Sequence, residues 1–400
     1  MSQPPIASND RAPDILILGA SARAAAASAL RAGLRPAAVD LFADVDLQDI
    51  APTRKIDQYP LEFIAAAATF DDCPFVYTGG LENHPNVVDR IARDRIVWGN
   101  TGEPLIRSRD PFLIDRLLRE QNLPRPKLRS RDAPPAPDGV WLLKNFRSSA
   151  GQGVRSWDGT HSPRVDEYFQ KRVDGVSVSA VYVASADQTR LCGLTRQLVG
   201  LLELNAPPFA WCGSHGPIQL PAPASDQVER TGTLIARQCG LRGLFGIDFI
   251  VDGETAIPVD VNPRYPASLE VLELAGGRSI FADHCRIFGA HLPELPNQRG
   301  QQTVAKAVLY AKQPLCFPSL TSVPGGDPEV GIPALADCPA AGTWIRPGEP
   351  ICTLFAVGND AHSCVAELTN RVQACRRKLD MPPQTSPTFQ GVLEPLRFRG

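Results

Sequence analysis

The stretch LFGIDFIVDGETAIPVDVNPRYP, residues 244–266, constrains the fold of this chain more than any other. Its two short apolar runs flank Asp252-Gly253, a dipeptide that strongly favours a β-hairpin turn. Asp248, Asp260 and Asn262 lie in the same stretch, although polar side chains are uncommon in a buried hairpin. The sequence therefore predicts a hairpin with one polar face.

The length of the loop decides which side chains share that face. Side chains alternate along a strand, so Asp260 and Asn262 lie on one face. A two-residue turn would leave Asp248 on the other face, whereas a loop of three residues (252–254) or five (252–256) would bring it to the same one. We expect an odd loop with a cation between the carboxylates, because facing carboxylates repel each other. Carboxylate and amide oxygens suit Mg²⁺ that bridges phosphates. The alternative is a solvated polar face on an edge strand.

A second stretch, GVWLLKNFRSSAGQGVR at residues 139–155, carries a lysine at the end of an apolar run. Lys144 is followed by a loop that contains Ser149, Gly151 and Gly153. Glycines let backbone N–H groups come close to an anion, and a lysine supplies a point charge for phosphate. The alternative is a lysine whose stem is buried and whose charge reaches solvent before a hairpin loop.

A third stretch, YFQKRVDGVSVS at residues 168–179, predicts an extended segment. Its backbone and the amide of Gln170 could hydrogen-bond the edge of a purine. The alternative is an ordinary edge strand.

In order and spacing, the three stretches resemble the ATP-grasp superfamily over residues 105–290. In that family two sheets clamp ATP, and the last motif binds one or two Mg²⁺ ions, which Mn²⁺ can replace. The resemblance implies a phosphate-binding group made of Lys144, Ser149, Gly151 and Gly153. It implies an adenine hinge made of Gln170, Lys171 and Val173. It implies a metal site made of Asp248, Asp260 and Asn262. It also implies that Arg264 faces the γ-phosphate or the acyl intermediate. Lys144 and Arg264 are the catalytic candidates.

A narrower resemblance rests on three further segments, TRQLVG, FAWCGSHGP and ADCPAAGTWIRPGEPICTLFAVG. They resemble predicted ATP-dependent carboligases related to biotin carboxylase. Such proteins occur in organisms that use tetrahydromethanopterin for one-carbon transfer. The resemblance implies a ligase without naming its acid.

The chain departs from the family pattern in three places. The metal-binding acids of the family are usually glutamates, and both are aspartates here. Pro111 stands where many members place a lysine that contacts the α-phosphate, and Arg107 or Arg109 could compensate. Val176 and Ser177 stand where the family often has a glutamate that binds the ribose.

The N-terminal stretch DILILGASARAAAASALRAGLRPAAVDLF predicts a strand, a helix capped by Ser21 and ended by Gly33, and a second strand. This order opens a parallel sheet. Asp40 lies at the distance of a ribose contact in dinucleotide-binding folds, but Gly19 is the only glycine of the three that the fingerprint needs. We therefore expect a Rossmann-like scaffold without NAD.

The predicted fold is α/β and α+β with several domains. Residues 1–104 are expected to form a Rossmann-like domain that precedes the ATP-grasp core. Residues 105–297 are expected to form that core, with a lid at about 125–190. Within the core, the sequence predicts a helix from Pro111 that Pro124 ends, and another helix over roughly 268–290. Residues 298–400 are expected to form a small, mainly β domain that closes over the core.

The composition narrows the class of function. The formal net charge is −2 and the basic residues form no runs, which argues against nucleic acid as a partner. No apolar run reaches the roughly 18 residues of a membrane span, and the N-terminus lacks the pattern of a signal peptide. Ten dispersed cysteines favour reduced thiols and a cytoplasmic location. Met1 and Met381 are the only methionines, so no biotin-type Met-Lys-Met motif is present.

The leading prediction is an ADP-forming ligase that joins a small-molecule carboxylate to an amine. Two alternatives remain open, a nucleotide-binding protein without turnover and a carboxylase that uses bicarbonate without biotin. The sequence leaves homo-oligomerisation open.

Overall fold

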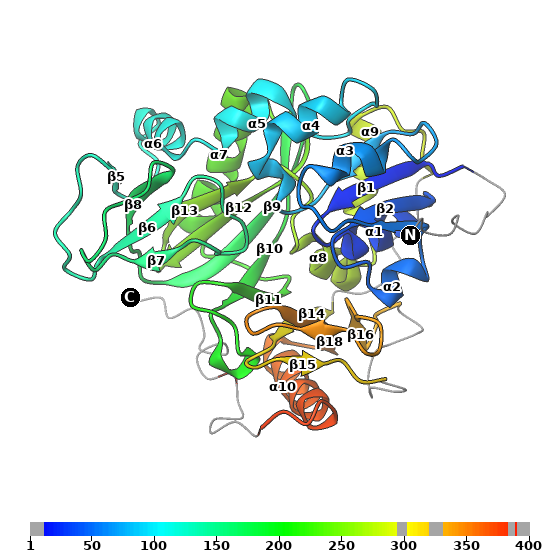
Figure 1. Cartoon of the computed structure of the whole chain (residues 1–400). Coiled ribbons are helices and arrows are strands. Elements are labelled where there is room, and N and C mark those ends of the chain that lie inside the picture. The colour runs from blue at the N-terminus through cyan, green and yellow to red at the C-terminus, as the bar shows by residue number, and fades with distance from the viewer. Residues whose placement is uncertain (1–11, 294–301, 320–330, 383–388, 390–400) are drawn as a thin grey trace.

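The computed structural model describes residues 12–293, 302–319, 331–382 and 389, which Figure 1 shows as coloured ribbons. Four parallel strands form an N-terminal sheet in the order β3-β2-β1-β4. They are β1 (Ile15–Gly19), β2 (Pro36–Asp40), β3 (Thr53–Lys55) and β4 (Phe75–Tyr77). The predicted strand-helix-strand opening of a parallel sheet is confirmed.

Helices cover both faces of this sheet. They are α1 (Arg23–Arg31), α2 (Val45–Gln48), α3 (Glu62–Ala67), the 3₁₀ helix η1 (Leu81–Asn83), α4 (Pro85–Ile91) and α5 (Gly102–Ser108). Ile15 and Ile17 belong to the core under α1, whereas Leu16 and Leu18 belong to the core under α3 and α4. A strand buried on both faces explains the unbroken apolar run in the sequence.

Two details of this region differ from the predictions or refine them. The N-cap of α1 is Ala22, which makes no side-chain capping bond, so the predicted cap at Ser21 is wrong. Asp40 is buried, and its carboxylate accepts backbone N–H bonds from Ala22, Phe42 and Ala43. Asp40 therefore closes the turns after β1 and β2 and does not face the cavity described below.

Eight antiparallel strands form the central sheet, in the order β13-β12-β9-β10-β11-β14-β18-β16. They are β9 (Val176–Ala184), β10 (Thr189–Val199), β11 (Trp211–Gly216), β12 (Gly243–Asp252), β13 (Thr255–Asn262), β14 (Thr303–Tyr310), β16 (Leu335–Ala336) and β18 (Pro350–Gly358). The sheet begins with the hairpin β12-β13 and ends with strands from the C-terminal quarter of the chain. One continuous sheet thus joins both regions.

Further helices lie against this sheet. They are α6 (Pro111–Glu120), α7 (Ala222–Cys239), α8 (Leu269–Gly276), α9 (Ile280–Ile287) and α10 (Ala361–Lys378), with the 3₁₀ helix η2 (Leu202–Leu204). A single helix was expected over 268–290. It is two helices, because Gly277 adopts φ +61° after α8 and the Ser279 side chain caps α9.

A small separate sheet with the order β5-β8-β6-β7 lies beside the β12-β13 end of the central sheet (Figure 1). Its strands are β5 (Leu128–Ser130), β6 (Trp141–Asn145), β7 (Arg155–Ser156) and β8 (Glu167–Lys171). It has its own core of four residues, Trp141, Leu143, Trp157 and Phe169. The next strand, β9, already belongs to the central sheet.

The two strands around Pro347-Gly348 pair with different partners. β17 (Trp344–Ile345) pairs with β15 (Leu315–Cys316), whereas β18 pairs with β14 and β16. α10 covers β14 and β18 and completes a second core there. The domain boundaries expected from the sequence stay predictions. Within the described ranges, no helix has both the length and the apolar character needed to cross a bilayer.

Candidate functional site

The hairpin predicted from the sequence exists, but its loop is shorter than expected. Asp252 pairs with Thr255, so the loop consists of Gly253 and Glu254 alone. The prediction of an odd loop is wrong. A two-residue loop in a regular ladder would leave the two aspartates on opposite faces.

A β-bulge restores the shared face. Phe249 pairs with Pro258, but the next pair is Asp248 with Asp260, so Val259 is an extra residue on β13. A bulge adds one residue to one strand and so changes which side chains face each other. The extra residue of the bulge has the same effect as one more residue in the loop. The two aspartates therefore lie directly opposite each other.

The polar face of the hairpin is tightly connected. The Asp248 carboxylate accepts a hydrogen bond from Gln197 Nε2 at 2.9 Å and another from Asn262 Nδ2 at 3.1 Å. Burial raises the pKa of Asp248 to about 6, and repulsion by Asp260 adds to the rise. A cation between the two carboxylates would oppose both effects.

The donor set fits Mg²⁺ or Mn²⁺, because two carboxylates and one amide provide hard oxygen ligands. Among the described residues, no group of three or more His, Cys, Asp or Glu side chains could hold a metal. Asp248, Asp260 and Asn262 would therefore hold the ion as a partial set. Phosphate oxygens and water would complete its coordination.

Arg109 lies beside this face. Its Nη1 donates to Asp260 Oδ1 at 2.9 Å and to the Val261 carbonyl at 2.7 Å. Its Nη2 donates to Asn83 Oδ1 at 3.0 Å and to the Ser148 carbonyl at 2.8 Å. Arg109 thus connects the hairpin, the N-terminal region and the glycine loop.

The other residues considered around Pro111 have different surroundings. Pro111 opens α6, where Asp110 caps the helix through the N–H groups of Phe112 and Leu113. Arg107 donates to the Gln238 carbonyl and does not line the cavity. Of the two arginines that could compensate for Pro111, only Arg109 lies at the site.

Lys144, near the end of β6, reaches the hairpin. Its Nζ donates to the Val259 carbonyl at 2.8 Å and to Gln170 Oε1 at 3.3 Å. The extra residue of the bulge therefore provides an acceptor for this lysine. Lys144 and Gln170 are both buried, so the lysine charge lies in a site with little access to water.

The loop after β6 is fixed by close contacts. Gly151 and Gly153 have φ values of +77° and +76°. A Cβ on Gly151 would lie 1.9 Å from the Phe209 carbonyl oxygen, so this position accepts only glycine. Ser149 Oγ accepts from Asn83 Nδ2 at 2.7 Å and donates to Glu82 Oε1 at 3.0 Å.

Arg264, directly after the hairpin, uses every nitrogen of its guanidinium. Nε donates to Glu82 Oε1 at 3.1 Å, Nη1 to the Tyr265 carbonyl at 2.9 Å and Nη2 to Asn262 Oδ1 at 3.0 Å. The arginine side chain is 10% exposed and the glutamate is 0% exposed. The position of Arg264 is therefore fixed by Asn262 at the end of β13 and by Glu82 in the 3₁₀ helix η1.

One cavity of about 960 Å³ joins these groups. This volume is at the upper end of the range of about 300–1,000 Å³ typical of small-molecule sites. The cavity is lined by ten of the eleven residues predicted from the sequence: Lys144, Ser149, Gly151, Gly153, Gln170, Val173, Asp248, Asp260, Asn262 and Arg264. Lys171 is exposed and lies outside the lining.

Sequence reasoning missed Glu82, Asn83 and Gln197 at this site. A signal for two of them exists, because Glu82 and Asn83 follow Gly79-Gly80 directly after β4. Polar residues after a glycine pair at the carboxyl end of a parallel strand mark a typical ligand position. Gln197 lies within a strand, β10, and has no such signal.

Comparisons with known proteins agree with this geometry. Residues 109–268 match the family described as the ATP-grasp domain. No curated protein matches the sequence. The structure is similar to biotin carboxylase from Campylobacter jejuni in a β,γ-ATP complex, with 15% identity, 92% of each chain covered and a TM-score of 0.63.

Two further structures are similar over their lengths. N5-carboxyaminoimidazole ribonucleotide synthetase from Thermus thermophilus has 15% identity, with 92% of this chain and 99% of that chain covered and a TM-score of 0.64. The biotin carboxylase domain dimer of 2-oxoglutarate carboxylase from Hydrogenobacter thermophilus, with MgADP and bicarbonate, has 13% identity, coverages of 91% and 90% and a TM-score of 0.66. At these identities the likeness establishes the fold and leaves the substrates open.

Proposed function

We propose an ATP- and Mg²⁺-dependent ligase, because the chain has the ATP-grasp fold and its residues 109–268 match the ATP-grasp domain family. It activates a small-molecule carboxylate as an acyl phosphate for attack by an amine, and it releases ADP. The observation that carries this proposal is the pairing of Asp248 with Asp260 in a cavity that Lys144 also lines, with the Lys144 Nζ bonded to the Val259 carbonyl beside Asp260. Opposed carboxylates and a buried lysine are the charges that phosphate and a divalent cation require.

Each group has a defined part in the proposal. Lys144, Ser149 and the backbone at Gly151 and Gly153 bind the phosphates, and Gln170 with the backbone at Lys171 and Val173 binds adenine. Asp248, Asp260 and Asn262 hold the metal, which neutralises charge on the β- and γ-phosphates when bound. Arg264 faces the γ-phosphate or the acyl phosphate. Arg109 is added here as a further cation near the phosphates.

The reaction balances in two displacements. A carboxylate oxygen attacks the γ-phosphorus, and the bond to the β–γ bridging oxygen breaks, so ADP leaves. The amine nitrogen then attacks the acyl carbon, the bond to the phosphate oxygen breaks, and the nitrogen loses one proton. Fixed positive groups lower the barrier of both steps because they face the developing negative charge without reorganising.

Two alternatives to this ligase remain. One uses bicarbonate as a substrate, and the other binds the nucleotide without turnover. A bicarbonate-using carboxylase without biotin is supported by the likeness to two carboxylases, one of them with bicarbonate bound. A nucleotide-binding protein without turnover is supported by Pro111 at the position of an expected lysine. The cytoplasmic location, the tetrahydromethanopterin context and the three-domain division stay predictions.

A trapping experiment tests the proposal. The protein is incubated with ATP, Mg²⁺, hydroxylamine and a panel of carboxylates, and both the nucleotide product and hydroxamate are measured. ADP together with hydroxamate is expected. ADP formed with bicarbonate alone would favour the carboxylase, and ATP binding without any product would favour the protein without turnover. AMP with pyrophosphate would contradict the scheme.

A further inference from the structure

The cavity extends from the proposed nucleotide site to the carboxyl edge of the N-terminal sheet. Its lining includes Ser21 after β1, Phe42 after β2 and Thr78 after β4. Small molecules in α/β proteins bind at this edge, where the loops after parallel strands meet. The cavity therefore reaches beyond the proposed nucleotide site.

Asp44 is the unusual group at this end. It lines the cavity, is 8% exposed, and occupies the N-cap position of α2 without making a capping hydrogen bond. Among the described residues, its carboxylate has no hydrogen-bond or ion-pair partner. A buried carboxylate without a partner is costly, so its retention at a cavity wall points to a ligand. Burial raises the pKa of Asp44 to about 8, and the neighbouring acids add to the rise.

The acids around Asp44 already have partners. Asp40 accepts three backbone hydrogen bonds, as described above. Asp46 accepts the backbone N–H groups of Asp337 and Cys338, both at 2.9 Å. Asp337 itself accepts from Arg23 Nε at 2.9 Å. The free carboxylate oxygens at this end therefore belong to Asp44.

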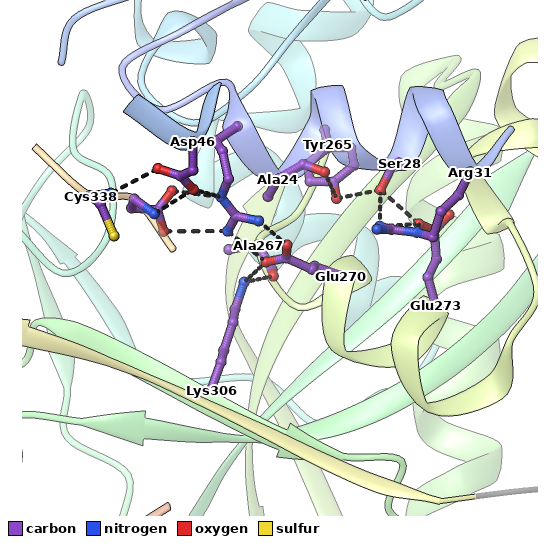
Figure 2. A network of polar contacts seen from close by, with 12 residues as sticks. Ala24, Ser28, Arg31, Asp46, Tyr265, Ala267, Glu270, Glu273, Lys306 and Cys338 are labelled. Atoms are coloured by element: carbon purple, nitrogen blue, oxygen red, sulfur yellow. Dashed lines mark hydrogen bonds and ion pairs between the residues drawn. The ribbon is translucent and has the colours of Figure 1, made fainter. Parts of the chain in front are cut away.

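The cations nearby are also engaged. Glu270 forms ion pairs with the Arg23 guanidinium and with Lys306, and Figure 2 shows Glu270 beside Lys306. Lys306 Nζ lies 3.1 Å from Glu270 Oε2 and donates to the Ala267 carbonyl at 2.6 Å. Burial alone would raise the pKa of Glu270, but Arg23 and Lys306 outweigh it and hold that pKa well below its usual value. Neither cation is available to Asp44.

The charges at this end do not balance within the described residues. Two cations, Arg23 and Lys306, pair with three carboxylates, those of Asp46, Asp337 and Glu270, and leave Asp44 without an ion pair. An organic cation with N–H donors would supply the missing positive charge and would also hydrogen-bond the Asp44 oxygens.

We propose that Asp44 binds a protonated amino group of the acceptor substrate other than the neutral nitrogen that attacks, so that this substrate is an amine that also carries an ammonium group. The inference rests on the proposed ligase function, to which it adds the class of the amine and the residue that selects it. Asp44 is a binding residue and takes no part in the bond changes. A buried carboxylate and an ammonium form charge-assisted hydrogen bonds, which are about twice as strong as neutral ones.

Direct binding measurements test this without turnover. The probes are 1-aminobutane and 1-butanol, which share a carbon chain and differ in charge, and affinity is measured by calorimetry with and without ATP and Mg²⁺. The amine is expected to bind more tightly than the alcohol. Asp44→Asn is expected to weaken amine binding about ten- to one-hundred-fold. Equal affinities for amine and alcohol, or equal amine affinity in the variant and the native protein, would overturn the proposal.

Three controls sharpen the result. Asp49→Asn removes an exposed carboxylate just after α2, outside the cavity, and is expected to leave amine affinity unchanged. Asp44→Glu keeps the charge and is expected to retain part of the binding. If Asp44→Asn does not fold, the pH dependence of the native protein decides: amine affinity is expected to fall below pH 8, as Asp44 takes up a proton. A flat profile would contradict the proposal.

The outcome separates this proposal from the ligase function. If ADP and hydroxamate form but amines bind independently of Asp44, the function stands and the amine site is wrong. If amines bind through Asp44 but no carboxylate yields ADP, the amine site stands and the ligase function is wrong.

Discussion

Glu82 and Arg264 form a buried ion pair that joins the end of the β12-β13 hairpin to the carboxyl edge of the N-terminal sheet. The same glutamate accepts from Ser149 Oγ and from the Gly80 N–H. One carboxylate therefore aligns the hairpin, the glycine loop and the turn after β4. We expect Glu82 to act as a positioning residue for Arg264.

Glu82→Gln keeps the size of the side chain and removes its charge. Arg264 would lose its ionic partner, so kcat for ADP formation is expected to fall about ten- to one-hundred-fold while the KM for ATP changes little. The free energy of unfolding is expected to fall by about 1–3 kcal/mol. Steady-state kinetics and urea unfolding check both. The control Glu103→Gln alters an exposed acid in α5 and should change neither.

Lys144→Ala removes the buried cation between the hairpin and Gln170. ATP binding is expected to weaken by about 1.5–3 kcal/mol, the scale of a charged hydrogen bond. Calorimetry with ATP and Mg²⁺ measures it. The matched variant Lys127→Ala, at an exposed lysine outside the cavity, is expected to bind as the native protein does. Native affinity in Lys144→Ala would remove this residue from the site.

Asp260→Asn keeps the hairpin but removes one of its two facing charges. The prediction is that ATP binding loses its dependence on Mg²⁺, because one metal ligand of three becomes a weaker donor. ATP titrations at several Mg²⁺ concentrations show this directly. Asp252→Asn, at the exposed tip of the same hairpin, serves as the control. An Mg²⁺ dependence that persists in Asp260→Asn would argue against the metal site.

Gly151→Ala and Gly139→Ala separate backbone strain from a clash. Both glycines have positive φ, +77° and +79°, so backbone strain is expected to cost each alanine variant about 1 kcal/mol of stability, and the clash is expected to add to the loss in Gly151→Ala. A Cβ at Gly139 meets no atom within 4 Å, whereas one at Gly151 would overlap the Phe209 carbonyl. Only Gly151→Ala should therefore weaken ATP binding. Melting curves and ATP titrations of both variants decide this, and equal affinities would rule out a phosphate-binding role for the loop.

His284 makes the stability depend on pH. Burial lowers the pKa of His284 to about 4, and its Nδ1 accepts the Leu244 N–H at 2.8 Å. The native state thus binds fewer protons than the unfolded state between about pH 6.5 and pH 4, so stability falls as the pH falls through this window. The contribution lost is about 2–3 kcal/mol. Urea unfolding from pH 7 to pH 4 measures this loss. The dependence of the free energy of unfolding on pH should become weaker in His284→Gln. It should not change in His161→Gln, which alters an exposed ring.

The sequence was sufficient for the parts of the fold and site that depend on local pattern. The spacing of apolar residues predicts the strand-helix-strand opening and the helix from Pro111, and the residues that favour turns predict the turn near Asp252-Gly253. The resemblance to ATP-grasp proteins correctly named the fold. It also selected ten cavity-lining residues, whose binding roles stay predictions.

The remaining features depend on contacts between distant segments. The bulge at Val259 could not be assigned from the sequence, because Pro258 is compatible with an edge strand or with a bulge, and the extra residue is fixed by pairing across the strands and by Lys144. Glu82 could not be connected to Arg264 because 182 positions separate them. The break at Gly277 was missed because the apolar residues on its two sides continue a helical pattern.

The continuity of the central sheet has a consequence for synthesis of the chain. β11 (Trp211–Gly216) obtains its second neighbour only when β14 (Thr303–Tyr310) pairs with it, long after β11 itself has been made. Until the ribosome has released that later strand, β11 presents a row of unpaired N–H and C=O groups along one edge. Unpaired strand edges of this kind can pair with strands of other chains, which leads to aggregation. Slow translation between residues 217 and 302 should therefore favour aggregation of the nascent protein, and chaperone binding is expected to be strongest over this interval.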